Sequence, residues 1–229
     1  MNTNEQETSS SDEERGGGLL KAVKSVIIKP EDAKALVEAQ RKRFNERYSK
    51  DDESKIQERI ARAIVARYAK LAAIVGGGSA LTGIVPGLGT VIAVTGGATA
   101  DAIICMKLQV DMCYCLAEAF GYDITREDSR HLAFLIACGG TLEKAGVGAG
   151  VKIATKAGVK MLRQYLKGAA LQAVREFFKR IGFRFARKAA EKALPFGIGV
   201  VISSSANYGL TRYVGRQAKK WFIIDRDTE

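Results

Sequence analysis

The chain contains a long stretch without charge, residues 71–100, and any fold must provide a place for it. Eight of its thirty residues are glycine, and Pro86, Gly87 and Gly89 lie at its centre. Proline fixes φ and glycine readily adopts positive φ, so this pattern predicts a turn between two helical arms. Each arm of about 15 residues would span about 22 Å, less than the hydrocarbon core of a bilayer at about 30 Å. We therefore predict a helical hairpin that packs in the core or inserts only partly into a membrane.

A second uncharged stretch, residues 193–211, begins with a similar pattern. Its turn residues are Pro195, Gly197 and Gly199. We interpret the two stretches as a weak internal repeat, in which a turn opens a helix of small residues. The second helix is predicted to continue to Trp221 and Phe222, and its basic and aromatic end would suit a membrane interface.

The rest of the sequence favours helix over strand. The chain has three prolines in 229 residues and is rich in Ala, Leu, Lys, Glu and Arg, which are good helix formers. Further helices are expected at 19–27, 32–47, 54–75 with Ser54 as cap, 90–120 closed by Gly121, and 125–138 ended by Gly139 and Gly140. The prediction is an all-α protein: a single helical bundle with two Gly/Pro-centred apolar hairpins and a long basic amphipathic helix.

Residues 101–120 are predicted to form an amphipathic helix. At 100° per residue, Lys107, Asp111 and Glu118 share one face. The opposite face carries Cys105, Leu108, Met112, Cys115 and Ala119. Asp101 falls on the apolar face, where a carboxylate needs a partner or has a raised pKa. Asp101 is therefore a candidate buried acid, which either pairs with a cation of a neighbouring helix or binds a ligand.

No residues are arranged as a metal site or a catalytic centre. The cysteines at 105, 113, 115 and 138 lie on apolar helices, which predicts buried free thiols in a reducing cytoplasm. One Cys-Tyr-Cys pair and the distant His131 are a poor ligand set for zinc. We expect no metal, no cofactor and no catalytic residue.

The positive charge is concentrated in residues 152–192, which hold twelve Lys or Arg and two Glu. Lys152, Lys156, Lys160, Arg163 and Lys167 follow helical spacing and form one stripe, and Arg175 and Lys179 continue the charge. Such a stripe is a solvated helix face, a contact for anionic lipid, or a contact for nucleic acid. Motifs typical of nucleic-acid binding are absent from the sequence, so lipid is the preferred partner.

Several motifs resemble the pattern of EcsC proteins over about residues 55–222. The first half carries Val85-Pro86-Gly87-Leu88-Gly89-Thr90, Gly96-Gly97-Ala98-Thr99-Ala100-Asp101, Gln109 and Phe120-Gly121-Tyr122-Asp123. The second half carries Leu194-Pro195-Phe196-Gly197, Asn207-Tyr208, Thr211-Arg212, Gly215-Arg216-Gln217-Ala218 and Phe222. The sequence is also similar to the helical domain appended to some bacterial membrane-associated GTPases, although it has no P-loop. The resemblance implies an all-helical, membrane-associated bacterial protein and supplies no active site. Asp101 matches the acidic position of the family, whereas Phe120 stands where the family often has Tyr.

These observations predict an acidic tail at 1–18, a helical domain at 19–224 and a short tail at 225–229. The expected function is non-enzymatic binding to an anionic membrane surface, at the inner face of the cytoplasmic membrane. A membrane-protein partner and oligomerisation are compatible with it. Three alternatives stay open: a pore-forming or membrane-disrupting protein, a small-ligand binder or enzyme centred on Asp101, and a nucleic-acid binding protein.

Overall fold

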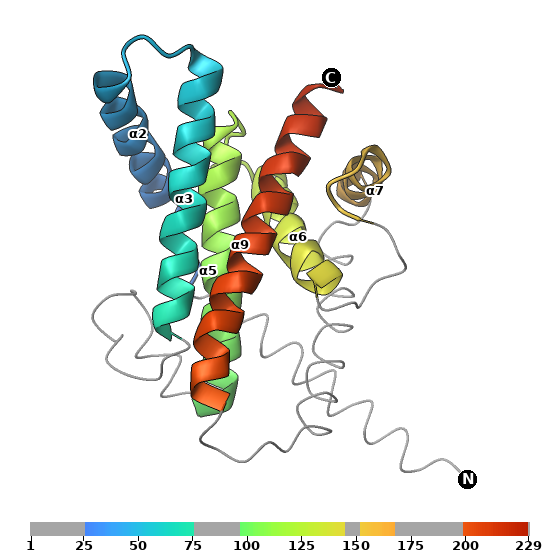
Figure 1. Ribbon diagram of the computed structural model, residues 1–229. Coiled ribbons are helices and arrows are strands. Elements are labelled where there is room, and N and C mark those ends of the chain that lie inside the picture. Colours follow the sequence, from blue (N-terminus) through green and yellow to red (C-terminus); the bar gives the residue numbers. More distant parts are fainter. Residues whose placement is uncertain (1–25, 76–96, 145–151, 168–198, 229) are drawn as a thin grey trace.

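The computed structural model describes residues 26–75, 97–144, 152–167 and 199–228 (Figure 1). These parts contain six α-helices and no strand, which confirms the predicted all-α bundle. The helices are α2 (Pro30–Arg47), α3 (Glu53–Val75), α5 (Gly97–Ala119), α6 (Glu127–Lys144), α7 (Lys156–Lys167) and α9 (Gly199–Arg226).

Helix α5 lies at the centre of the bundle and contacts α2, α3, α6 and α9 (Figure 1). Every residue from Ile104 to Ala117 is buried, so the predicted solvent-facing side of this helix is wrong. Lys107 and Asp111 are 5% and 3% exposed, and Glu118 is half-buried. Helix α2 also packs against α5, and the backbone N–H of Ile28, just before α2, donates to Asp111 on the face that the sequence pattern assigned to water.

Helices α3 and α9 run antiparallel along most of their length (Figure 1). Arg226 at the end of α9 contacts Gln57 near the start of α3, and the Ser204 hydroxyl donates to the carbonyl of Ala73 near the other end. Gly215 of α9 lies against Val65 of α3 and Met112 of α5. A Cβ atom at that position would lie 2.7 Å from Val65 Cγ2 and 2.9 Å from Met112 Sδ.

Trp221 and Phe222 belong to the core and not to a membrane interface. Both side chains are fully buried, and the ring of Phe222 stacks on Phe120 with 5.6 Å between ring centroids. The Trp221 Nε1–H has no hydrogen-bond partner among the described residues. Burial of these large rings at the contact of α5 and α9 corrects the interfacial role predicted for the end of α9.

The ends of two helices follow recognisable capping rules. Helix α3 begins at Glu53, and its cap is Asp52, whose Oδ1 accepts the Lys55 N–H at 2.9 Å, rather than the predicted Ser54. Gly121 closes α5 as predicted, with φ +88°. The Gly121 N–H donates to Glu118 O and the Tyr122 N–H to Ala117 O, which is a Schellman motif.

Helix α6 passes through Gly139 and Gly140 and continues to Lys144, so the predicted end at Cys138 is wrong. Both glycines serve close packing instead of helix termination. A Cβ atom on Gly139 would lie 2.8 Å from Ile153 Cγ2, and one on Gly140 would lie 3.4 Å from Val214. The missing side chains therefore let the segment before α7 and the middle of α9 approach α6.

Several predictions fall outside the described residues. These are the tail at 1–18, most of the helix at 19–27, the turn residues Pro86, Gly87, Gly89, Pro195 and Gly197, and the basic residues Arg175 and Lys179. Gly199 is the first residue of α9. Helix α9 also continues through Asp225 and Arg226, past the predicted domain end at residue 224.

Two glycines of α9 provide a matched test of this packing. Gly215→Ala should lower the free energy of unfolding by about 1–3 kcal/mol, because the added methyl group overlaps Val65 and Met112. Gly209 is exposed and a Cβ atom there meets nothing within 4 Å, so Gly209→Ala should raise stability by about 0.5–1 kcal/mol. Urea denaturation of both variants checks this; equal effects would show that α3 and α9 do not pack closely at Gly215.

Candidate functional site

Helix α7 presents lysines to solvent and apolar side chains to the bundle. Lys152, Lys156 and Lys160 are exposed, whereas Val159 and Leu162 are buried where α7 packs against α6 and α9. The helix begins at Lys156, not at Lys152, because Thr155 caps it: the Thr155 hydroxyl accepts the Gly158 N–H at 3.1 Å. Lys152 thus precedes the helix but stays on the exposed surface beside it.

Arg163 departs from the predicted outward stripe. Its guanidinium binds Asp225 through two hydrogen bonds, Nε to Oδ1 at 2.5 Å and Nη2 to Oδ2 at 2.8 Å. Asp225 is 1% exposed and also accepts the hydroxyl of Tyr122. This bidentate pair joins α7 to the end of α9 and gives Arg163 a structural role, while its side chain stays 40% exposed and its predicted lipid contact stays a prediction. The side chain of Lys167 lies outside the described residues.

A buried ion pair joins Lys107 and Asp111, one turn apart on α5. Asp111 Oδ1 also accepts the backbone N–H of Ile28 at 2.9 Å, just before α2 begins. Burial raises the pKa of Asp111, and the Lys107 ammonium and the Ile28 N–H partly oppose this. The pair therefore ties the chain entering α2 to the central helix. Sequence analysis missed this role, although opposite charges four residues apart in an apolar helix were a usable signal.

Polar side chains also connect α5, α6 and α9 inside the bundle. Gln109 Oε1 accepts the Thr141 hydroxyl at 2.5 Å, and Gln109 Nε2 contacts Cys105 Sγ at 3.4 Å. The Cys105 thiol in turn donates to Asn207 Oδ1 at 3.8 Å. Asp101 lies one turn before Cys105 in α5, but its side chain is outside the described residues, so its predicted role as a buried acid stays a prediction.

All four cysteines are free and buried, as predicted. Burial raises the pKa of Cys115 to about 12, and burial also raises the pKa of Cys113 and that of Cys138. These thiols are therefore protonated and inert near neutral pH. Within residues 26–75, 97–144, 152–167 and 199–228, no three His, Cys, Asp or Glu side chains gather in a way that would hold a metal ion.

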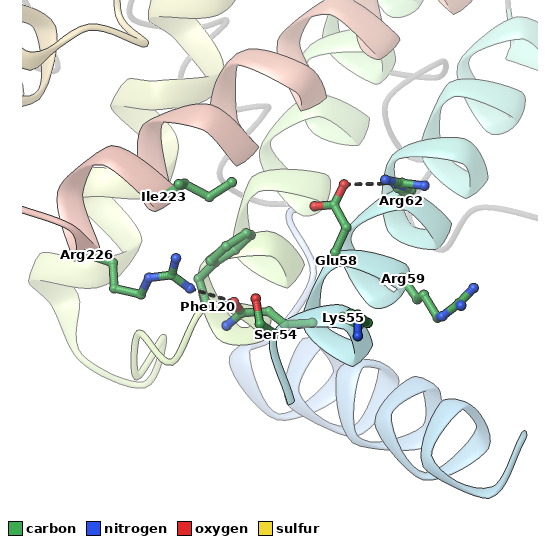
Figure 2. Close-up of a pocket in the computed structure, with 9 residues that line it drawn as sticks. Ser54, Lys55, Glu58, Arg59, Arg62, Phe120, Ile223 and Arg226 are labelled. Carbon is green, nitrogen blue, oxygen red and sulfur yellow. Dashed lines mark hydrogen bonds and ion pairs between the residues drawn. The ribbon is translucent and has the colours of Figure 1, made fainter. Parts of the chain in front are cut away.

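A groove of about 400 Å³ lies where the start of α3 meets the end of α9 (Figure 2). We call it the end groove. Its lining residues are Ser54, Lys55, Gln57, Glu58, Arg59, Arg62, Phe120, Ile223 and Arg226. Glu58 accepts hydrogen bonds from Arg62 at 2.8 Å and from Lys219 at 2.7 Å. Burial raises the pKa of Glu58, but these two cations outweigh it and the pKa is lowered overall. No local sequence pattern predicts the end groove, because its residues come from α3, from α9 and from Phe120 just after α5.

A membrane span is not found among the helices in the described part of the chain, since none is both long and apolar enough. Comparison with known proteins finds no matching family model, no matching curated protein and no matching solved structure. The EcsC-like assignment therefore stays a prediction from the sequence motifs.

The buried pair on α5 allows a test of the core. Asp111→Leu and Lys107→Met should each lower the free energy of unfolding by about 3–5 kcal/mol, because each leaves one buried charge without its partner. The double variant Lys107→Met with Asp111→Leu should lose much less than the sum of the single losses. Urea denaturation of the three variants measures the coupling, and additive losses would contradict a buried pair.

Proposed function

We propose that this protein is a non-enzymatic, EcsC-like helical protein that binds anionic membrane surfaces through the outer face of α7. The observation that carries the proposal is the exposure of Lys156 and Lys160 on α7, whose apolar side is already buried in the bundle, and of Lys152 just before this helix. The ion pair of Arg163 with Asp225 joins α7 to the end of α9, so the helix that carries Lys156 and Lys160 is held on the bundle.

The electrostatic attraction between these three lysines and an anionic surface can be estimated. A Lys or Arg near an anionic surface contributes about 1 kcal/mol, so three lysines contribute about 3 kcal/mol. This is a weak, salt-sensitive attachment on its own. The sequence that follows, residues 168–192, adds seven Lys or Arg and two Glu, which would strengthen it. The cytoplasmic leaflet, which is rich in anionic lipid, is the proposed location.

Charge reversal on α7 tests the proposal. The triple variant Lys152→Glu, Lys156→Glu, Lys160→Glu should lose most of its co-sedimentation with anionic vesicles at low salt, because attraction becomes repulsion. Wild-type binding should fall as salt rises and should be absent with neutral vesicles. The matched control changes the exposed residues Lys34, Lys42 and Lys50 to Glu, which gives the same net charge.

The control residues Lys34 and Lys42 lie on α2, which is on the opposite side of the bundle from α7 (Figure 1). The control variant should therefore keep most of its vesicle binding. Equal losses in both variants would show that net charge alone drives binding, and would refute a role for the face of α7. Vesicle binding that resists salt and is accompanied by dye release would instead support insertion of the hairpins. An affinity for DNA that falls steeply with salt, together with no vesicle binding, would support nucleic-acid binding.

A further inference from the structure

The end groove combines cations, hydrogen-bond donors and an apolar floor. Figure 2 shows the ring of Phe120 between Arg226 on one side and Glu58 on the other, with Ile223 of α9 beside it. Ser54 and Lys55 come from the first turn of α3, where Asp52 already accepts the backbone N–H of Lys55. The cations that line this end of the groove are therefore the side chains of Lys55 and Arg226, and the middle of the groove is apolar.

Arg226 is held over this end by a relay of hydrogen bonds. The Gln57 side-chain amide donates to the carbonyl of Ala119 at 3.1 Å, which fixes its orientation. Gln57 Oε1 then accepts Arg226 Nη1 at 3.1 Å. A guanidinium has five N–H donors, and its contacts with Gln57 and the exposed Asp227 leave donors available to a ligand.

The cations at this end are paired only with exposed acids. Lys55 contacts Asp52 at 3.0 Å with both side chains about 60% exposed, and Arg226 contacts the equally exposed Asp227 at 3.1 Å. Exposed pairs of this kind are weak, so a more highly charged anion competes with them readily. Glu58 does not oppose this, because Lys219 and Arg62 already neutralise it.

We propose that the end groove binds an organic phosphate, with the phosphate group at Arg226, Lys55 and Ser54 and the organic body on Phe120 and Ile223. A phosphate dianion is favoured over a carboxylate because its three terminal oxygens accept hydrogen bonds from α3 and α9 at the same time. The phosphate belongs either to a soluble phosphomonoester or to a lipid headgroup. This inference is independent of the proposed membrane binding through α7.

Calorimetric titration of the full chain with three probes tests the proposal: inorganic phosphate, phenyl phosphate and dihexanoyl phosphatidic acid. Phenyl phosphate should bind saturably with a 1:1 ratio and more tightly than inorganic phosphate, because only the former contacts Phe120 and Ile223. If phosphatidic acid binds much more tightly than phenyl phosphate, the phosphate group belongs to a lipid. If it binds equally or more weakly, the phosphate group belongs to a soluble ester. Absence of saturable binding by every probe would overturn the proposal.

Variants locate the binding to this groove. Arg226→Gln and, separately, Lys55→Gln should each weaken phenyl phosphate by about tenfold or more, since each removes a charge-assisted hydrogen bond. The control is Lys220→Gln, which removes an exposed cation of α9 outside the groove and should change the affinity less than about twofold. Equal weakening by all three variants would show diffuse attraction and refute the site.

Fluorescence gives a second readout. The only tryptophan of the chain, Trp221, contacts Phe222 with 5.4 Å between ring centroids, and Phe222 stacks on Phe120 in the groove. Binding of phenyl phosphate should therefore shift or quench the fluorescence emission of Trp221. The dissociation constant obtained from this change should equal the one obtained by calorimetry. The triple variant Lys152→Glu, Lys156→Glu, Lys160→Glu should bind phenyl phosphate with the affinity of the wild type. Loss of phosphate binding by the groove and loss of membrane binding by α7 can therefore be distinguished.

Discussion

The structure depends on the burial of α5 on every side. Once α2, α3, α6 and α9 cover this helix, each polar group on it must find a partner inside the protein. Lys107 and Asp111 neutralise one another, Asp111 also binds the Ile28 N–H, and Gln109 binds Thr141. Two of these contacts join α5 to other parts of the bundle: Asp111 binds the segment before α2, and Gln109 binds α6.

Helix existence could be predicted from the sequence, whereas side-chain environment often could not. The helices at 54–75 and 90–120 and the glycine at 121 that ends the second of them were indicated by sequence, and α3, α5 and the helix end at Gly121 confirm this in the described residues. The 100° rule placed Lys107 in water because it describes a single helix and contains no information on the helices that pack around it, whereas Lys107 is 5% exposed. Gly139 is a second example. A glycine can end a helix or permit close packing, and only the position of Ile153 against Gly139 shows that the second case applies.

More of the basic face of α7 than of the end groove could be predicted from the sequence. The lysines of α7 form a local pattern, and helical spacing placed Lys156 and Lys160 on one face. Arg163 follows the same spacing, but its partner Asp225 is 62 residues away, so no local rule separates it from the exposed lysines. The end groove depends entirely on such distant contacts, since it joins the start of α3 to the ends of α5 and α9.

The last turn of α9 serves two surfaces at once. Asp225 turns inward to Arg163 and thereby supports α7, while its neighbour Arg226 faces the end groove and Gln57. Adjacent residues of a helix point about 100° apart, so a rotation of the backbone at this turn moves both side chains together. A rotation of this single turn would act as a mechanical linkage, displacing the support of the basic helix and reshaping the groove in the same movement.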